Sequence, residues 1–256
     1  CNIEVWTRNN EVLRLVPRQN EEVNSFWMCD HGRLNTFKFI NAEDRVDGPH
    51  IRVEGNLIKV GWDEAFAKAA SNLKAFGKDE VAVLGSAYAT VEDNFVAVKF
   101  AKSVLGTGHL DFVHHINPSF GDDILKNEDV TPNSKGAELA GVIPSKNGSD
   151  FNGIIKSIRE GKIKALYVLE DDILNDNPEL ETVLSKLDLL IINSTNFNKT
   201  TVLADIVFPS ATYAEKNGTF VNFTGRVQRI SPAIATNDVD RALEGMAMSR
   251  LDKFGT

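Results

Sequence analysis

Residues 162–194, KIKALYVLEDDILNDNPELETVLSKLDLLIINS, contain two continuous apolar runs on either side of a helix pattern. The runs at 164–170 and 188–194 have the length of strands, and their lack of alternation is typical of parallel strands covered on both faces. The segment 178–187 between them has the spacing of a helix. Strand, helix and strand in this order predict a parallel crossover unit and therefore an α/β fold.

A second unit of this kind lies earlier in the chain. Residues 79–87 form another apolar run that predicts a buried strand. The helix pattern 90–106 follows, and Thr90 and Asp93 have the spacing of a capping box at its start. A further helix pattern covers 151–161. We therefore expect a parallel-sheet α/β domain built from two series of strands and helices.

Outside these units the pattern changes. Within the first 60 residues, short runs of alternating polar and apolar residues flank two turn signals, one of them at Asn9-Asn10. This pattern predicts a small β-rich module. Residues 107–150 are dense in Gly, Pro, Asn and Asp and are typical of a long connection. We expect three segments: the β-rich module at 1–60, the α/β domain at 61–215, and at 216–256 a β-like or irregular segment that ends at the start of a helix.

Composition excludes several classes of function. The 256 residues include 28 Lys and Arg against 36 Asp and Glu, a net charge of −8, and no basic run is interleaved with aromatic residues, so we expect no nucleic-acid partner. No apolar run approaches the roughly 20 residues of a membrane span, so we expect no direct membrane insertion.

The sequence lacks an initiator Met and ends within a helix pattern that begins near Asp240. We expect a piece of a longer protein; the alternative is a mature lipoprotein with an acylated Cys1.

Few residues carry recognisable catalytic chemistry. The strand end at 85–86 precedes a helix, as in phosphate sites, but G-x-G-x-x-G is absent, so we interpret it as an ordinary turn. His114 and His115 are adjacent and lack spaced partners for a zinc set, so we interpret them as solvated loop residues. The acidic groups at 122–123 and 170–172 are typical of caps and exposed strand ends. We therefore identify no catalytic residue.

The two cysteines, Cys1 and Cys29, leave three possibilities open. They can form a disulfide, remain inert buried thiols, or supply half of a metal site, and composition alone favours inert thiols. The local sequence FWMCDHGR, residues 26–33, shifts that balance. Its Trp27 and Met28 would shield a sulfur from water, and the turn at 30–33 offers backbone N–H groups and positive charge to a thiolate-ligated cluster.

The same region resembles the iron–sulfur segment of molybdopterin oxidoreductases. Residues 1–33, CNIEVWTRNNEVLRLVPRQNEEVNSFWMCDHGR, are most similar to the G subunit of bacterial NADH:quinone oxidoreductase (complex I), in which a C-x2-C-x3-C motif runs directly into this pattern. The resemblance resumes in VGWDEAFAKAASNLK, residues 60–74, and in ADIVFPSATYAEKNGTFVNFTGRVQRISPA, residues 204–233. The three blocks occur in the order of the family, and the middle of the chain is covered only by loose pattern.

This resemblance implies a ligand set and a cofactor. Cys1 matches the third and Cys29 the fourth cysteine ligand of a [4Fe-4S] cluster, so this sequence holds two of the four metal ligands. The family's active enzymes are much longer and carry a Ser, Cys or selenocysteine on the metal. The segment 107–150 lies where one or more of their domains would be inserted. The resemblance therefore implies a shortened molybdopterin-oxidoreductase-type α/β domain behind an iron–sulfur-type module, with no molybdopterin.

The function implied is electron transfer or scaffolding. By resemblance, the chain belongs to a complex I-type NADH:quinone oxidoreductase assembly and passes electrons through iron–sulfur clusters. Its partners are other subunits of a respiratory or hydrogenase-type complex, and its place is cytoplasmic, peripheral to the inner membrane through that complex. The alternatives are a domain of a molybdopterin-dependent formate dehydrogenase or of an NAD-linked hydrogenase complex, and a plain interaction module with vestigial cysteines.

Two structural predictions follow from this interpretation. The sulfurs of Cys1 and Cys29 should lie within roughly 6 to 7 Å, because two ligands of one cubane cluster must converge. The segment 214–232 should serve packing, with both Phe220 and Phe223 buried. In that segment we also expect Glu215 to pair with a nearby base such as Arg226 or Arg229.

Overall fold

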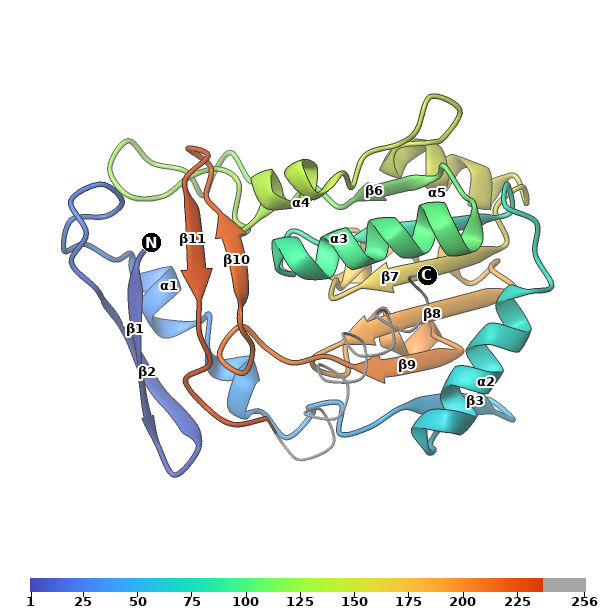
Figure 1. The fold of residues 1–256 in the computed structure, drawn as a ribbon, viewed down its shortest axis with the longest axis horizontal. Helices are drawn as coiled ribbons and strands as arrows, with labels where there is room; N and C mark the ends of the chain where they lie inside the picture. Colours follow the sequence, from blue (N-terminus) through green and yellow to red (C-terminus); the bar gives the residue numbers. More distant parts are fainter. Residues whose placement is uncertain (237–256) are drawn as a thin grey trace, which may run out of the picture.

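The computed structural model describes residues 1–236, so the helix predicted near Asp240 lies outside the described residues. Its centre is a seven-stranded sheet in the order β4-β3-β9-β8-β7-β5-β6 (Figure 1). The five strands from β6 to β9 are parallel, which confirms the predicted α/β class. They are β5 (Val81–Gly85), β6 (Leu110–Phe112), β7 (Ala165–Leu169), β8 (Leu189–Ser194) and β9 (Ile206–Pro209).

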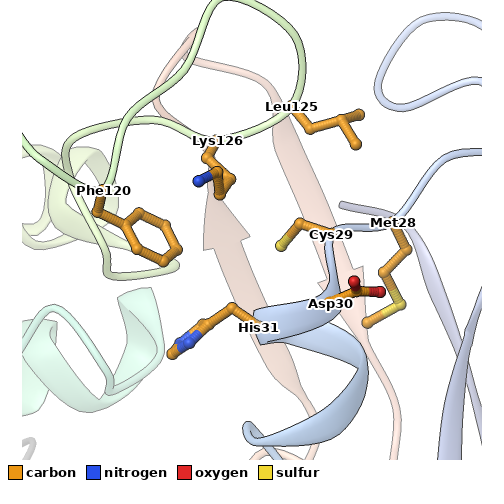
Figure 2. A pocket seen from close by; sticks show the side chains of 7 residues that line it. All are labelled: Met28, Cys29, Asp30, His31, Phe120, Leu125 and Lys126. Carbon is orange, nitrogen blue, oxygen red and sulfur yellow. The ribbon is translucent and has the colours of Figure 1, made fainter.

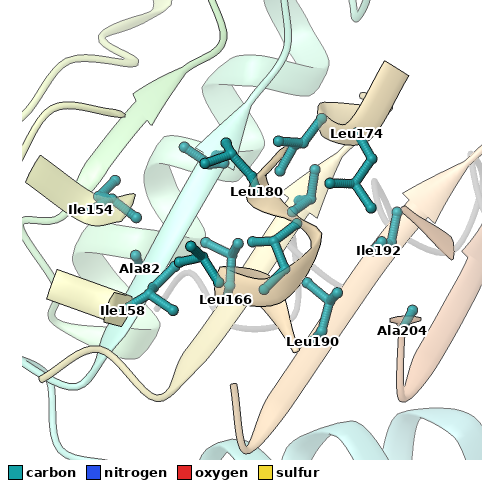
Figure 3. Close-up of a cluster of buried hydrophobic side chains, with 14 of the residues drawn as sticks. Ala82, Ile154, Ile158, Leu166, Leu174, Leu180, Leu190, Ile192 and Ala204 are labelled. Atoms are coloured by element: carbon teal, nitrogen blue, oxygen red, sulfur yellow. The ribbon is translucent and has the colours of Figure 1, made fainter. Parts of the chain in front are cut away.

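Helices cover both faces of this sheet because successive strand residues point to opposite sides. Leu166 and Leu190 pack on one side against Ile154 and Ile158, and Figure 3 shows this cluster. Ala165 belongs to the cluster on the other side. The first face carries α5 (Phe151–Arg159), α6 (Ile173–Asp176), η3 (Pro178–Leu180) and α7 (Glu181–Leu184); the second carries α2 (Trp62–Leu73), α3 (Val91–Lys99) and the π-helical turn η2 (Phe100–Leu105).

The sheet extends beyond the predicted boundaries of the α/β domain. The hairpin β3 (His50–Val53) and β4 (Asn56–Lys59) pairs antiparallel with β9, so residues 50–59 are attached to the α/β sheet rather than to the N-terminal module. The connection 107–150 also contributes structure, since β6 forms one edge of the sheet and α4 (Ser134–Ala140) packs on α3. Hydrophobic alternation identified β3 and β4 but not β6, which lies in the predicted connection; in each case a pairing partner far away in the chain determines the sheet.

The N-terminal hairpin forms a separate layer beside the sheet (Figure 1). It consists of β1 (Ile3–Arg8) and β2 (Glu11–Pro17), joined by Asn9 and Asn10, both with positive φ. The short helices α1 (Asp30–Leu34) and η1 (Lys38–Asn41) follow it.

A second hairpin lies between that layer and the main sheet (Figure 1). Its strands are β10 (Gly218–Val221) and β11 (Val227–Ile230), and the short turn η4 (Thr201–Leu203) lies earlier in the chain. Val12 and Leu15 are packed with Ala214 and Ile234, the residues that flank this hairpin in sequence. The end of the described chain therefore joins the N-terminal module to the α/β domain.

Candidate functional site

Cys29 lies immediately before helix α1 and acts as its N-terminal cap. The Cys29 sulfur accepts a hydrogen bond from the Gly32 backbone N–H at 3.4 Å. A sulfur in this position meets backbone N–H groups that favour negative charge. The neighbouring Met28 is buried with the N-terminal hairpin, while Trp27 is 60% exposed. Met28 thus packs into the N-terminal module, whereas Trp27 faces solvent and does not shield the sulfur as expected.

Cys1 is held close to this turn through Asn24. The Asn24 carboxamide oxygen accepts from the Asn2 backbone N–H at 2.8 Å, and its amide donates to the Trp27 carbonyl at 2.9 Å. Cys1 itself is exposed, and Cys29 is half-buried. That both sulfurs ligate one cluster stays a prediction.

The two cysteines are donors of the type that an iron–sulfur cluster uses, but they are only two of the four ligands that a [4Fe-4S] cluster needs. Both cysteines are free thiols, so they do not form the disulfide that the sequence left open. Among residues 1–236, no group of three or more His, Cys, Asp and Glu side chains is placed to hold a metal ion. Thiolates are the ligands of iron–sulfur clusters, and one of the two sulfurs here accepts a backbone N–H.

A pocket of about 380 Å³ opens beside Cys29. Figure 2 shows side chains from two parts of the chain around it: the start of α1 and the loop that follows β6. The lining residues are Met28, Cys29, Asp30, His31, Phe120, Leu125 and Lys126. The pocket lies where the N-terminal module meets the α/β domain.

A second polar site lies at the carboxyl edge of β5 and β7. The direction in which successive strands are added to the sheet changes at β5, because β6 lies on one side of it and β7 on the other. Open α/β sheets bind ligands at the carboxyl edge beside such a point. The Lys216 ammonium is buried and donates to Asp93 at 2.8 Å and to Glu170 at 2.8 Å. Burial lowers the pKa of Lys216, but the two carboxylates outweigh it and raise that pKa. Burial raises the pKa of Glu170.

His115 forms the second part of this edge. Its two ring nitrogens lie 2.6 Å from an Asp176 oxygen and 3.0 Å from an Asp171 oxygen. Burial alone lowers the pKa of His115, but hydrogen bonds and charge from these carboxylates raise it to about 9. An imidazole flanked by two carboxylates is stable as the imidazolium, which donates from both nitrogens. His115 thus fastens the loop after β6 to the end of β7.

Two family models match the chain. The model described as "Molybdopterin oxidoreductase" matches residues 45–134 and 112–241, which is more than half of the sequence. The chain belongs to the molybdopterin oxidoreductase family. A second model, described as "NADH-ubiquinone oxidoreductase NDSU1/NuoG-like, 4Fe-4S domain", matches residues 1–36. That match includes Cys1 and Cys29 and supports an iron–sulfur cluster.

Curated relatives of this molybdopterin oxidoreductase chain carry a formate dehydrogenase name. "Putative formate dehydrogenase YrhE" of Bacillus subtilis (strain 168) is 32% identical over 115 residues. A protein of Staphylococcus aureus (strain USA300), also named as a formate dehydrogenase, has the same identity over the same length. Each match covers 43% of this chain and 12% of the relative. This chain thus spans only a small part of the relatives it matches.

The family name raises the question of whether phosphate groups of a pterin cofactor fit at the β5 edge. The Asn94 carboxamide already bonds both the Ser86 N–H and the Ser86 carbonyl, at 2.9 and 2.8 Å. Asp93 and Thr90 form the capping box predicted from sequence at the start of α3. A Cβ on Gly218 would lie 2.4 Å from Thr90 Cγ2. The helix end is therefore capped by a carboxylate and covered by the β10–β11 hairpin, so an anionic phosphate does not fit there.

Several predictions about individual residues were wrong. His115 is buried and paired, rather than solvated, and Asp171 is buried rather than at an exposed strand end. Phe220 is half-buried, and Phe223 is 59% exposed because it lies in the turn of the β10–β11 hairpin, beyond the contact between β10 and α3.

The predicted partner of Glu215 was also wrong. Glu215 pairs with Arg45 at 2.9 Å, and the Arg45 guanidinium is held in place by the carbonyls of Ile40 and Thr195. Arg226, the expected base, instead pairs with Glu22 of the N-terminal module.

Proposed function

We propose that this chain is an electron-transfer and scaffold unit of a complex I-type NADH:quinone oxidoreductase assembly. The observation that carries the proposal is Cys29, whose sulfur accepts a backbone N–H in the segment that matches a NuoG-like 4Fe-4S domain. In this proposal Cys1 and Cys29 hold two of the four iron ligands of one [4Fe-4S] cluster. The cluster supplies one-electron transfer, and the chain positions and shields it.

The proposal includes no molybdopterin chemistry in this chain. The support is the β5–β7 edge, where the one ammonium of Lys216 is already shared by the carboxylates of Asp93 and Glu170 and is not free to bind an anionic ligand. The α/β domain then acts as a scaffold that holds the loop after β6 beside the cluster. Its partners are other subunits of a respiratory or hydrogenase-type complex.

We further propose a cytoplasmic location, peripheral to the inner membrane through the other subunits. Among residues 1–236, the helices are all too short or too polar to cross a bilayer.

A second candidate function is supported by the relatives' names. The chain would then be one domain of a molybdopterin-dependent formate dehydrogenase or of an NAD-linked hydrogenase complex. Metal and pterin analysis of the whole protein separates the proposals. Iron without molybdenum or tungsten supports the electron-transfer unit, and stoichiometric pterin with either metal supports the enzyme. Absence of all three supports an interaction module with vestigial cysteines.

A further inference from the structure

The loop after β6 brings a cation to the cysteine pocket. Of the seven residues that line the pocket, Lys126 is the single Lys or Arg, and it comes from a part of the chain almost 100 residues away from Cys29. Figure 2 shows Phe120, Leu125 and Lys126 on the side of the pocket opposite α1. No sequence pattern indicated this contact, since residues 107–150 have the composition of a connection.

This loop has a fixed conformation around the cation. One oxygen of Asp122 accepts the backbone N–H groups of residues 124–126 at 2.6 to 3.0 Å. The Asp122 N–H in turn donates to the Lys126 carbonyl at 2.9 Å, and Asn117 N–H donates to the Glu128 carbonyl at 2.7 Å. A turn closed by this many local bonds holds its side chains in place.

The ammonium of Lys126 is placed by an aromatic contact. It lies 5.1 Å from the centroid of the Phe120 ring, within the range of a cation–π interaction. The Phe120 ring packs edge-on against His31 of α1, with centroids 5.0 Å apart. The second Asp122 oxygen is 3.4 Å from the ammonium and offsets its charge only in part, because this is a long and solvent-exposed contact. Asp30 also lines the pocket and is the negative group nearest in sequence to the sulfur.

We propose that Lys126 acts electrostatically on the redox group at Cys29 without binding it. Its ammonium, which comes from outside the cysteine segment, makes the electrostatic potential at that group more positive. This inference rests on the proposed function, because the group concerned is the iron–sulfur cluster. A cluster gains one negative charge when it accepts one electron from its donor, so a fixed cation nearby stabilises the reduced form. Lys126 thus raises the reduction potential of the cluster.

Thiol alkylation in the metal-free chain tests the potential at the sulfur directly. With Cys1→Ser, Cys29 is the single thiol. The thiolate attacks the carbon of iodoacetate or of iodoacetamide, forms a C–S bond and releases iodide. The ratio of the two rate constants at one pH cancels the fraction of thiolate, because both reagents need the same thiolate. The ratio therefore reports how much the pocket favours an anionic reagent over a neutral reagent of similar size.

We expect Lys126→Gln to lower the iodoacetate-to-iodoacetamide ratio roughly two- to threefold at low ionic strength. The difference should disappear in about 0.5 M salt, where the Debye length is only a few ångström. Lys126→Arg should retain the wild-type ratio. The control is Lys135→Gln, which removes the same charge from an exposed ion pair with Glu138 outside the pocket and should leave the ratio unchanged.

An unchanged ratio in Lys126→Gln, or an equal fall in Lys135→Gln, would overturn the inference. In the whole protein with its cluster, the same Lys126→Gln change should shift the reduction potential to a more negative value. The alkylation result does not depend on a cluster. Failure of the proposed function would therefore appear as absent iron, and failure of this inference as an unchanged alkylation ratio.

Discussion

Lys216 joins Asp93 at the start of α3 to Glu170 at the end of β7, with 2.8 Å from its ammonium to each carboxylate. The three side chains come from distant parts of the chain and meet at the carboxyl edge of the sheet. Because the Lys216 side chain is 6% exposed and that of Glu170 is 10% exposed, the ion pair between them is screened little by water.

Replacing Lys216 with Met should destabilise the fold by about 3 kcal/mol, because it leaves buried carboxylates without a counter-charge. Urea unfolding at pH 7 measures this loss. Adding Glu170→Gln to Lys216→Met should recover part of it, since the double variant removes the most buried uncompensated charge. Equal stability of Lys216→Met and wild type would show that the pair does not hold this edge together.

His115 should make stability fall with rising pH. Its folded pKa of about 9 is above the unfolded value of 6.5. The contribution is therefore fully present below pH 6.5 and is lost as pH rises through about 9. The loss is on the order of 3 kcal/mol. Unfolding midpoints measured from pH 6 to 10 should show this slope in wild type, and His115→Gln should flatten it. A slope that persists in His115→Gln would assign the effect to another group.

Gly218→Ala should loosen the β10–β11 hairpin, because the added Cβ meets Thr90 Cγ2 at 2.4 Å. Overpacking of this kind costs roughly 1 to 3 kcal/mol. The matched control is Gly77→Ala, whose new Cβ would have an ordinary contact of 3.5 Å with Glu80. Faster hydrogen exchange at 218–230 in Gly218→Ala alone is the expected result; equal exchange in both variants would contradict it.

Local sequence patterns predicted the core of the fold, and long-range pairing accounts for the rest. The continuous apolar runs identified β5, β7 and β8, and the Thr90–Asp93 spacing identified the cap of α3. These signals arise within a few neighbouring residues.

The polar sites have no such local signal. Asp176 is 61 positions from His115, and Asp93 is 123 positions from Lys216. A buried charged residue and a solvated one look alike in sequence when the partner is this distant, which is why His115 and Asp171 were misassigned. The cysteine turn is the exception, because its Gly32 donor lies within three residues of Cys29.

The two cysteines should be bridged rapidly by a short bifunctional thiol reagent. If both ligate one cluster, their sulfurs lie within roughly 6 to 7 Å in the folded chain. A bis-methanethiosulfonate of about that span should give a single intramolecular cross-link, seen by mass spectrometry as one added bridge and no free thiol. Cys1→Ser should give only a singly attached reagent. Two independent additions in the wild type would place the sulfurs too far apart, since packed strands move little.

Iron content of the whole protein, isolated without oxygen from its source cells, tests most directly whether Cys29 holds a cluster. Wild type and Cys29→Ala are compared by iron and sulfide analysis and by low-temperature paramagnetic resonance after reduction, with molybdenum, tungsten and pterin measured in the same samples. Circular dichroism checks that the variant remains folded. We predict that Cys29→Ala loses about four irons and one reduced-cluster signal, and that wild type contains neither pterin nor its metals. Unchanged iron and resonance in Cys29→Ala, or stoichiometric pterin with molybdenum or tungsten in the wild type, would contradict the account.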